Sequence, residues 1–254
     1  MPIAPGPPLA LTPDLILRAY ALGVFPMADA RDAAEVYWVE PRARAVLPLD
    51  GFHLATSLRK TIAADRFRVT ADAAFDRVLA LCAEAADDRP DTWINPGIAR
   101  VFGELHRRGH AHSIEVWDGD RLAGGLYGLA LGRAFFGESM VSRARDASKV
   151  ALAWLVARLR VGGFALLDCQ FMTDHLASLG AVEISRADYL LRLGSALGAG
   201  GDGSGAGRFD ALDRGAGASS AAAGAADDPA GAATVSDSGP PPGKVIVQLL
   251  TQTS

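Results

Sequence analysis

The sequence has 254 residues, half of them hydrophobic, with a formal net charge of −4. This is enough chain for one large domain or for two small domains that share a core. No apolar run reaches the ~18 residues of a membrane span, and the N-terminus lacks a basic segment before an apolar one. We therefore expect a soluble, cytoplasmic protein without a membrane partner. The only cysteines, Cys82 and Cys169, lack metal-ligand spacing, so we expect reduced thiols.

The first 70 residues predict a small N-terminal α/β domain. Thr12-Pro13-Asp14 supplies the capping hydroxyl, the proline and the first-turn acid of a helix start. The turn at residues 23–27 is unusually apolar for a loop, so we expect it to pack inward. The pair Tyr37-Trp38 then precedes two arginines. Such a pair stacks on a nucleotide base or seals a small core, and the residues leave both interpretations open.

Basic side chains gather between residues 42 and 68. Six acids and three bases follow residue 198, so the rest of the chain carries only −1 of the net −4. A basic stretch on a nearly neutral body suits the docking of one end of a polyanion, although an ordinary solvated surface has the same composition. The cations of this stretch are Arg42, Arg44, Arg59, Lys60, Arg66 and Arg68.

Residues 71–194 predict a second, larger domain. Apolar side chains recur at helical spacing near residues 72–82 and 95–109, and the period then changes to two. The later predicted elements are strands over 113–117, 122–130 and 134–138 in an antiparallel meander, a helix that ends at Gly162, a strand over 164–168, a short helix over 173–179, a strand over 181–185 and one last turn over 188–193.

The tail has a different composition. Residues 195–243 are dominated by glycine, alanine, serine and aspartate. With so few bulky apolar side chains they cannot offset the entropy of ordering, so we expect them to be disordered. Residues 244–254 begin with a β-prone run, Lys244 to Leu250, which we expect to return as an added edge strand.

Asp168 and Gln170 follow directly on the apolar strand that starts at Phe164. A buried strand that ends in polar side chains usually opens onto a cleft. These two residues are therefore the first candidates for an active site. The alternative is that Asp168 caps the next turn and Gln170 is a surface residue.

The predicted meander, helix and central strand resemble the core of the N-acetyltransferase (GNAT-like) fold, so the fold class expected is α+β. Acyl-CoA enzymes of that type hold pyrophosphate on a glycine-rich loop before the central helix. The corresponding loop here, residues 139–148, contains no glycine. This disfavours a CoA donor and points by analogy to acyl transfer from another donor.

Seven short sequence motifs carry a more specific resemblance. They stand in order at residues 23–27, 92–94, 110–117, 137–140, 147–149, 168–170 and 175–181. Across roughly residues 11 to 193 the chain is similar to the leucyl/phenylalanyl-tRNA–protein transferase family. The resemblance implies an acetyltransferase-like domain behind a small N-terminal domain. It also implies transfer of leucine or phenylalanine from aminoacyl-tRNA to proteins that begin with arginine or lysine, which creates a degradation signal.

The resemblance implies that Asp168 and Gln170 are the catalytic pair, which orients and deprotonates the attacking amine; either of the two is a candidate for accepting the proton. Aminoacyl-tRNA is an activated ester, so the protein must supply positioning and proton management rather than a cofactor or a metal. Glu138 is our candidate for holding the acceptor's arginine or lysine side chain. Met140, Leu126 and Leu167 are candidates for an apolar donor pocket that also admits methionine. The terminal adenosine is expected to stack on Trp93 or Trp38, and the tRNA candidates are Arg42, Arg44, Arg59, Lys60, Arg143 and Arg145.

Two other classes of protein remain as alternatives. A CoA-dependent acetyltransferase is opposed by the glycine-free loop. A non-catalytic tRNA- or peptide-binding module has no need of Asp168 beside Gln170. We expect the enzyme to be a monomer. Ser139 lacks the second glycine of a hydrolase nucleophile elbow. His110 and His112 share a strand face without a third ligand, so we expect no metal site.

Overall fold

The computed structural model describes residues 11–84, 92–198, 205–214 and 240–252. They form an α+β fold with a mixed seven-stranded sheet in the order β4-β5-β6-β7-β8-β3-β9 and a separate two-stranded ribbon, β1-β2. The strands are β1 (Phe25–Met27), β2 (Tyr37–Val39), β3 (Ala43–Val46), β4 (Arg68–Ala71), β5 (Ala111–Asp118), β6 (Arg121–Leu131), β7 (Ala134–Ser142), β8 (Leu166–Gln170) and β9 (Val182–Ser185). The helices are α1 (Pro13–Ala21), α2 (Thr56–Ala63), α3 (Phe75–Cys82), α4 (Pro96–Arg107), α5 (Ala147–Val161), α6 (Asp174–Ser178), α7 (Arg186–Ala196) and α9 (Gly243–Thr251).

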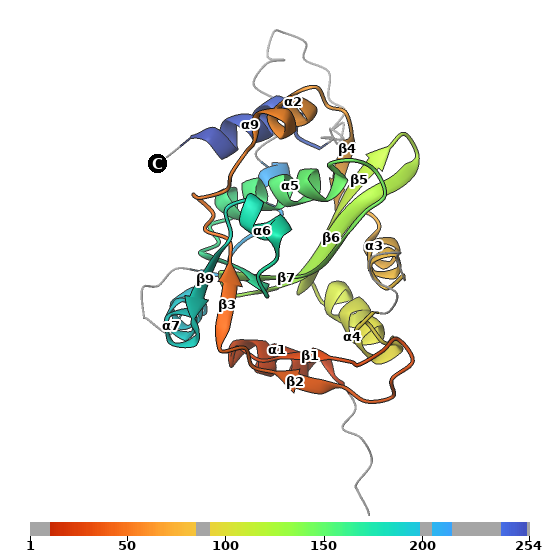
Figure 1. Cartoon of the computed structure of the whole chain (residues 1–254), viewed down its shortest axis with the longest axis vertical. Helices are drawn as coiled ribbons and strands as arrows, with labels where there is room; N and C mark the ends of the chain where they lie inside the picture. Colours follow the sequence, from red (N-terminus) through yellow and green to blue (C-terminus); the bar gives the residue numbers. More distant parts are fainter. Residues whose placement is uncertain (1–10, 85–91, 199–204, 215–239, 253–254) are drawn as a thin grey trace, which may run out of the picture.

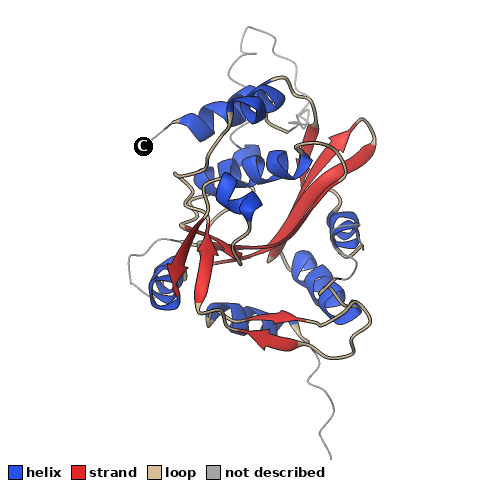
Figure 2. Cartoon of the chain, in the orientation of Figure 1, coloured by secondary structure: helices blue, strands red, loops and turns tan. Residues whose placement is uncertain are grey.

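Helices cover both faces of the sheet (Figures 1 and 2). Helices α2, α5, α6 and α9 contribute to one hydrophobic cluster, and α1, α3, α4 and α7 contribute to the other. The sheet separates the two clusters, since alternate residues of each strand point to opposite faces. Among the described residues, no helix combines the length and apolar character that crossing a bilayer requires.

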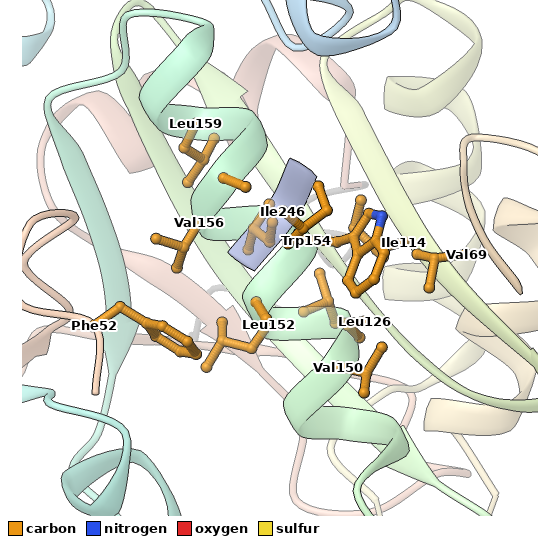
Figure 3. Packing of buried hydrophobic residues seen from close by; sticks show 14 of the residues in the cluster. Phe52, Val69, Ile114, Leu126, Val150, Leu152, Trp154, Val156, Leu159 and Ile246 are labelled. Carbon is orange, nitrogen blue, oxygen red and sulfur yellow. The ribbon is translucent and has the colours of Figure 1, made fainter. Parts of the chain in front are cut away.

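Helix α5 is the centre of the first cluster (Figure 3). Its residues from Val150 to Leu159 are buried on all sides, because the sheet lies beneath the helix while α2 and α9 pack over it. Ile114 and Leu126 of the sheet and Ile246 of α9 belong to the same cluster. A helix that is apolar all round is typical of such a position between two layers.

The predicted helix start at Thr12 agrees with the structure, and Asn95 caps the helix predicted near residues 95–109. The side chain of Thr12 accepts a hydrogen bond from the backbone N–H of Leu15, and Asn95 accepts one from that of Ile98. The antiparallel meander of β5, β6 and β7 is also present. The structure adds α2, β1, β2 and β4, which have no counterpart among the predicted elements, and α7 is a full helix rather than one turn.

The prediction of a C-terminal strand is wrong. Residues 243–251 form helix α9, which buries Ile246 and Leu250 at a spacing of four residues against the core. Asp65 accepts a hydrogen bond from the backbone N–H of Gly243 at 2.7 Å, and Arg160 donates to the carbonyl of Leu249. Tertiary packing therefore overrides the β propensity of this run.

The expectation of disorder is wrong for residues 205–214. Phe209 and Leu212 are buried in the α5 cluster, and Arg158 of α5 forms an ion pair with Asp213. These two buried side chains and the ion pair anchor this short segment. The other residues predicted to be disordered fall mainly within 199–204 and 215–239, which lie outside the described residues. The expected boundary at residue 70 coincides with no break in the sheet, since β3 and β4 both belong to it.

Candidate active site

The candidate site lies where strands β7 and β8 separate. These two strands pair in parallel over three positions, ending with Phe136 opposite Asp168. Beyond that point β7 continues beside β6, while β8 ends two residues later at Gln170. The separation leaves space between the strands, and polar side chains from both strands are found there.

A β-bulge presents Glu138. Gly128 of β6 pairs with Gly137 and Tyr127 pairs with Ser139, so Glu138 is an extra residue on β7. A bulge changes the direction of a side chain and is frequent beside active sites. Gly128 is required here, because a Cβ atom on it would lie 2.3 Å from the carbonyl oxygen of Phe136.

A second irregularity, on β8, separates Asp168 from Gln170. Ala45 pairs with Gln170 and Val46 with Asp168, so Cys169 is an extra residue. Gln170 has a left-handed backbone, with φ of 58°, which is uncommon for a residue other than glycine. Regular strand geometry would place both polar side chains on one face, but it does not persist at this point.

Asp168 is fully buried and does not line the cavity described below. Arg44 donates to its carboxylate from Nε at 2.9 Å and from Nη2 at 2.7 Å. The hydroxyl of Tyr189 donates at 2.8 Å, and so does the backbone N–H of Gln170. Burial, followed by the charge of Asp168, raises the pKa of Tyr189 above its ordinary value, so this hydroxyl remains a proton donor at neutral pH.

Arg44 is 1% exposed. Its guanidinium lies 4.7 Å from the ring centre of Phe25 and 4.5 Å from that of Tyr189, and Nη1 donates to the carbonyl of Gly23 at 3.1 Å. The prediction that Arg44 binds tRNA is therefore wrong, because its charge is enclosed and already paired with Asp168. The pairing partner is 124 positions away in sequence.

Gln170 and Glu138 meet through their side chains. The Nε2 of Gln170 donates to Oε1 of Glu138 at 3.1 Å. Burial raises the pKa of Glu138 to about 8, so the carboxyl group holds its proton at neutral pH. A salt bridge from Glu138 to Arg143 or Lys149 is the alternative to a role in substrate binding. It is not formed, since Arg143 pairs with Glu84 and Lys149 lies nearest Asp146.

Glu138 and Gln170 open onto a cavity of about 310 Å³. Of the residues predicted for the substrate, Trp93, Met140, Leu126 and Leu167 line it. Trp38 does not; it lies on β2 opposite Pro26 and is 38% exposed. The cavity is also lined by residues that the sequence had not singled out for this role: Leu152, Leu155, Phe171, Thr173, His175, Leu176, Cys169, Phe25 and Met27. Of these, Phe25 and Met27 lie in the apolar turn at residues 23–27, and Cys169, His175 and Leu176 lie in motifs that carry the family resemblance.

The remaining tRNA candidates are exposed. Arg59 and Lys60 lie on α2, away from its buried residues Leu58 and Ile62. Arg42 precedes β3, and Arg143 and Arg145 lie in the loop before α5. Within the part of the chain that the structure describes, no three side chains are grouped to hold a metal ion.

Two family models match the chain. Residues 46–194 match the leucyl/phenylalanyl-tRNA protein transferase family, and residues 10–42 match the N-terminal domain of the same family. Three similar proteins carry the name leucyl/phenylalanyl-tRNA–protein transferase. The one from Rhizorhabdus wittichii is 60% identical over 96% of this chain and 99% of its own length. Those from Zymomonas mobilis and Cereibacter sphaeroides are 64% and 60% identical, over 74% and 75% of this chain and 70% and 87% of their own lengths.

These matches first define the class of enzyme, an aminoacyltransferase. The chain belongs to the leucyl/phenylalanyl-tRNA–protein transferase family, as its short sequence motifs had indicated. Among solved structures, the C-terminal domain (DUF2156) of a putative lysylphosphatidylglycerol synthetase from Agrobacterium fabrum covers 66% of this chain and 55% of its own. At 10% identity and a TM-score of 0.33, that similarity does not define the fold.

Proposed function

We propose that this protein transfers leucine or phenylalanine, and less readily methionine, from aminoacyl-tRNA to proteins that begin with arginine or lysine. The new N-terminal residue marks the acceptor for degradation. The observation that carries this proposal is the hydrogen bond between Gln170 and Glu138 at the wall of an apolar cavity. We further propose that the enzyme acts in the cytoplasm as a monomer.

The cavity suits an apolar aminoacyl side chain. Its walls include Met27, Leu126, Met140 and Leu167, and methionine adapts to both branched and aromatic shapes. Its volume falls within the range of small-molecule sites. Trp93 lines the cavity and supplies an aromatic face for the terminal adenosine, with Trp38 on the neighbouring ribbon as the second candidate. Stacking on a base is tolerant of sequence, which suits an end that all tRNAs share.

In the proposed reaction the neutral α-amine of the acceptor attacks the ester carbonyl of aminoacyl-tRNA. A peptide bond forms, the bond to the 3′-oxygen of the tRNA breaks, the amine loses one proton and the 3′-oxygen gains one. The carboxamide oxygen of Gln170 accepts a hydrogen bond from the amine while its Nε2 remains on Glu138. Because Asp168 lies behind Gln170, it orients the amine through Gln170 rather than by contact.

Glu138 is proposed to receive the cationic side chain of the acceptor. A cation beside a buried carboxyl group favours the ionised form, so binding of arginine or lysine would offset the raised pKa of Glu138. An acceptor with an acidic or apolar first residue does not stabilise the ionised form of Glu138 in this way. This gives selectivity for the charge of the acceptor without a preformed negative surface.

The donor tRNA is proposed to lie across the exposed cations Arg42, Arg59, Lys60, Arg143 and Arg145. We also propose that residues 71–194 form an acetyltransferase-like domain. This is supported by the parallel pair β7-β8 that separates beside the site and by the buried helix α5. A CoA donor remains disfavoured, since residues 139–148 contain no glycine.

The test supplies leucyl-tRNA and a peptide that begins with arginine, and follows the peptide by mass spectrometry. We expect a product extended by one leucine, and no product from the same peptide with an acetylated N-terminus or with an initial glutamate. A parallel reaction with acetyl-CoA should leave the peptide unchanged. An acetylated peptide, with no leucine added from the tRNA, would overturn the proposal.

A further inference from the structure

Arg44 connects three parts of the candidate site without lining the cavity. It pairs with Asp168 on β8, donates to the carbonyl of Gly23 just before β1, and stacks on Phe25. Phe25 is itself a wall of the cavity. Tyr189 of α7 belongs to the same group, since its hydroxyl also donates to Asp168.

Asp168, whose carboxylate is held by Arg44 and Tyr189, contacts Gln170 directly. Its Oδ1 accepts the backbone N–H of Gln170, two positions further on, which is the hydrogen bond of an Asx turn. The same hydrogen bond fixes the backbone N–H of Gln170, the residue that has the left-handed backbone. The left-handed conformation brings the carboxamide of Gln170 to Glu138. Arg44 is therefore two hydrogen-bonded steps from the group that meets the cavity.

The group has features that a purely structural ion pair does not need. All the donors to Asp168 converge on a carboxylate with no exposed surface, and burying two charges is often no better for stability than well-packed apolar residues. A role as a tRNA contact is excluded by the enclosure of the guanidinium. The ion pair fixes the orientation of the Asp168 carboxylate, because a guanidinium that donates two hydrogen bonds holds a carboxylate in one orientation.

We propose that Arg44, assisted by Tyr189, is a positioning residue for aminoacyl transfer: it fixes Asp168, and through it the left-handed turn that holds Gln170 against Glu138. This inference rests on the proposed function. Arg44 does not touch either substrate. Its removal should slow the chemical step and leave the affinity for tRNA intact.

The test removes both charges together, so that neither is left buried alone. The double variant Arg44→Met/Asp168→Leu is compared with Arg158→Met/Asp213→Leu, which removes a similar pair that does not line the cavity. The measurements are the single-turnover rate from bound leucyl-tRNA with saturating peptide, the Kd for leucyl-tRNA and the thermal midpoint. We expect the first variant to lose about 100-fold in rate, the size of effect that a small misplacement produces, with an unchanged Kd. The control variant should keep the wild-type rate.

A folded Arg44→Met/Asp168→Leu variant with the wild-type rate would overturn the proposal, and so would a loss of tRNA affinity alone. If that variant does not fold, Arg44→Lys and Tyr189→Phe replace it. Arg44→Lys keeps the charge but not the fork, and Tyr189→Phe removes one donor. Each is expected to lower the rate severalfold at constant Kd, and wild-type rates in both would contradict the proposal. Failure of the proposed function is a separate result, since the wild-type protein would then give no extended peptide.

Discussion

Two buried arginines of this protein make nearly the same contacts and lie in different settings. Arg44 forks onto Asp168, donates to one backbone carbonyl and stacks on Phe25. Arg158 forks onto Asp213, donates to the carbonyl of Phe209 and stacks on the ring of that residue.

The difference between the pairs lies in the carboxylate. The side chain of Asp168 has no exposed surface, whereas that of Asp213 is 45% exposed. Asp168 makes two further hydrogen bonds, to Tyr189 and to the backbone of Gln170. Among the described residues, Arg158 is the side chain that donates to Asp213. We infer that the first pair shapes a site and that the second fastens residues 205–214 to α5. Two ion pairs with similar contacts around the arginine thus have different roles, because the two carboxylates contact different groups.

The largest expected effect is on stability. Asp168→Ala leaves the charge of Arg44 buried without its partner, which should lower the free energy of unfolding by about 3–5 kcal/mol. Asp213→Ala also leaves a buried guanidinium, that of Arg158, but the carboxylate it removes is 45% exposed and water can take its place, so the loss should be smaller than for Asp168→Ala. Urea denaturation of the two variants measures the contrast, and equal losses would remove the distinction between the pairs.

The next effect separates stability from activity. Phe209→Ala deletes a buried ring that packs on Phe135 and His112, and should cost about 3 kcal/mol. Since residues 205–214 do not line the cavity beside Glu138, the transfer rate at a temperature where the variant is folded should stay at the wild-type value. A rate lowered tenfold or more in the folded variant would show that this segment belongs to the site.

A smaller effect concerns the cavity side of the site alone. Because the pKa of Glu138 is raised from 4.5 to about 8, the folded protein binds more protons than the unfolded chain between these values. The unfolding free energy therefore falls as pH rises through this range. Glu138→Gln removes that contribution, so the variant should gain about 2 kcal/mol relative to wild type between pH 5.5 and 7. Denaturation curves at both pH values test this, and a constant difference would contradict it.

Much of the fold follows from local signals in the sequence. The side chains of Thr12, Asn95 and Thr173 cap their helices, and the meander follows from alternating residues and the turn at Gly119. Helix α9 and the segment around Phe209 depend on packing against α5 instead. The average composition of residues 195–243 does not reveal that Phe209 and Leu212 are buried. The β-prone run at residues 244–250 forms a helix because a helix buries both Ile246 and Leu250, four residues apart, against the core.

The candidate site shows the same limit. The polar end of a buried strand was enough to select Asp168 and Gln170, and regular strand geometry would place two residues at this spacing on one face. The extra residue Cys169 and the left-handed backbone of Gln170 break that spacing. Neither has a local signal. Arg44 was assigned to tRNA because charge can be read from the sequence, whereas a buried partner 124 positions away cannot.

The most direct measurement concerns the carboxamide of Gln170. The variant Gln170→Gly keeps the left-handed backbone, which glycine adopts readily, and removes only the side chain that meets Glu138. With leucyl-tRNA bound and peptide saturating, the single-turnover rate should fall about 100-fold while the Kd for leucyl-tRNA stays within about twofold of wild type. A folded variant that transfers leucine at the wild-type rate would contradict the account of this site.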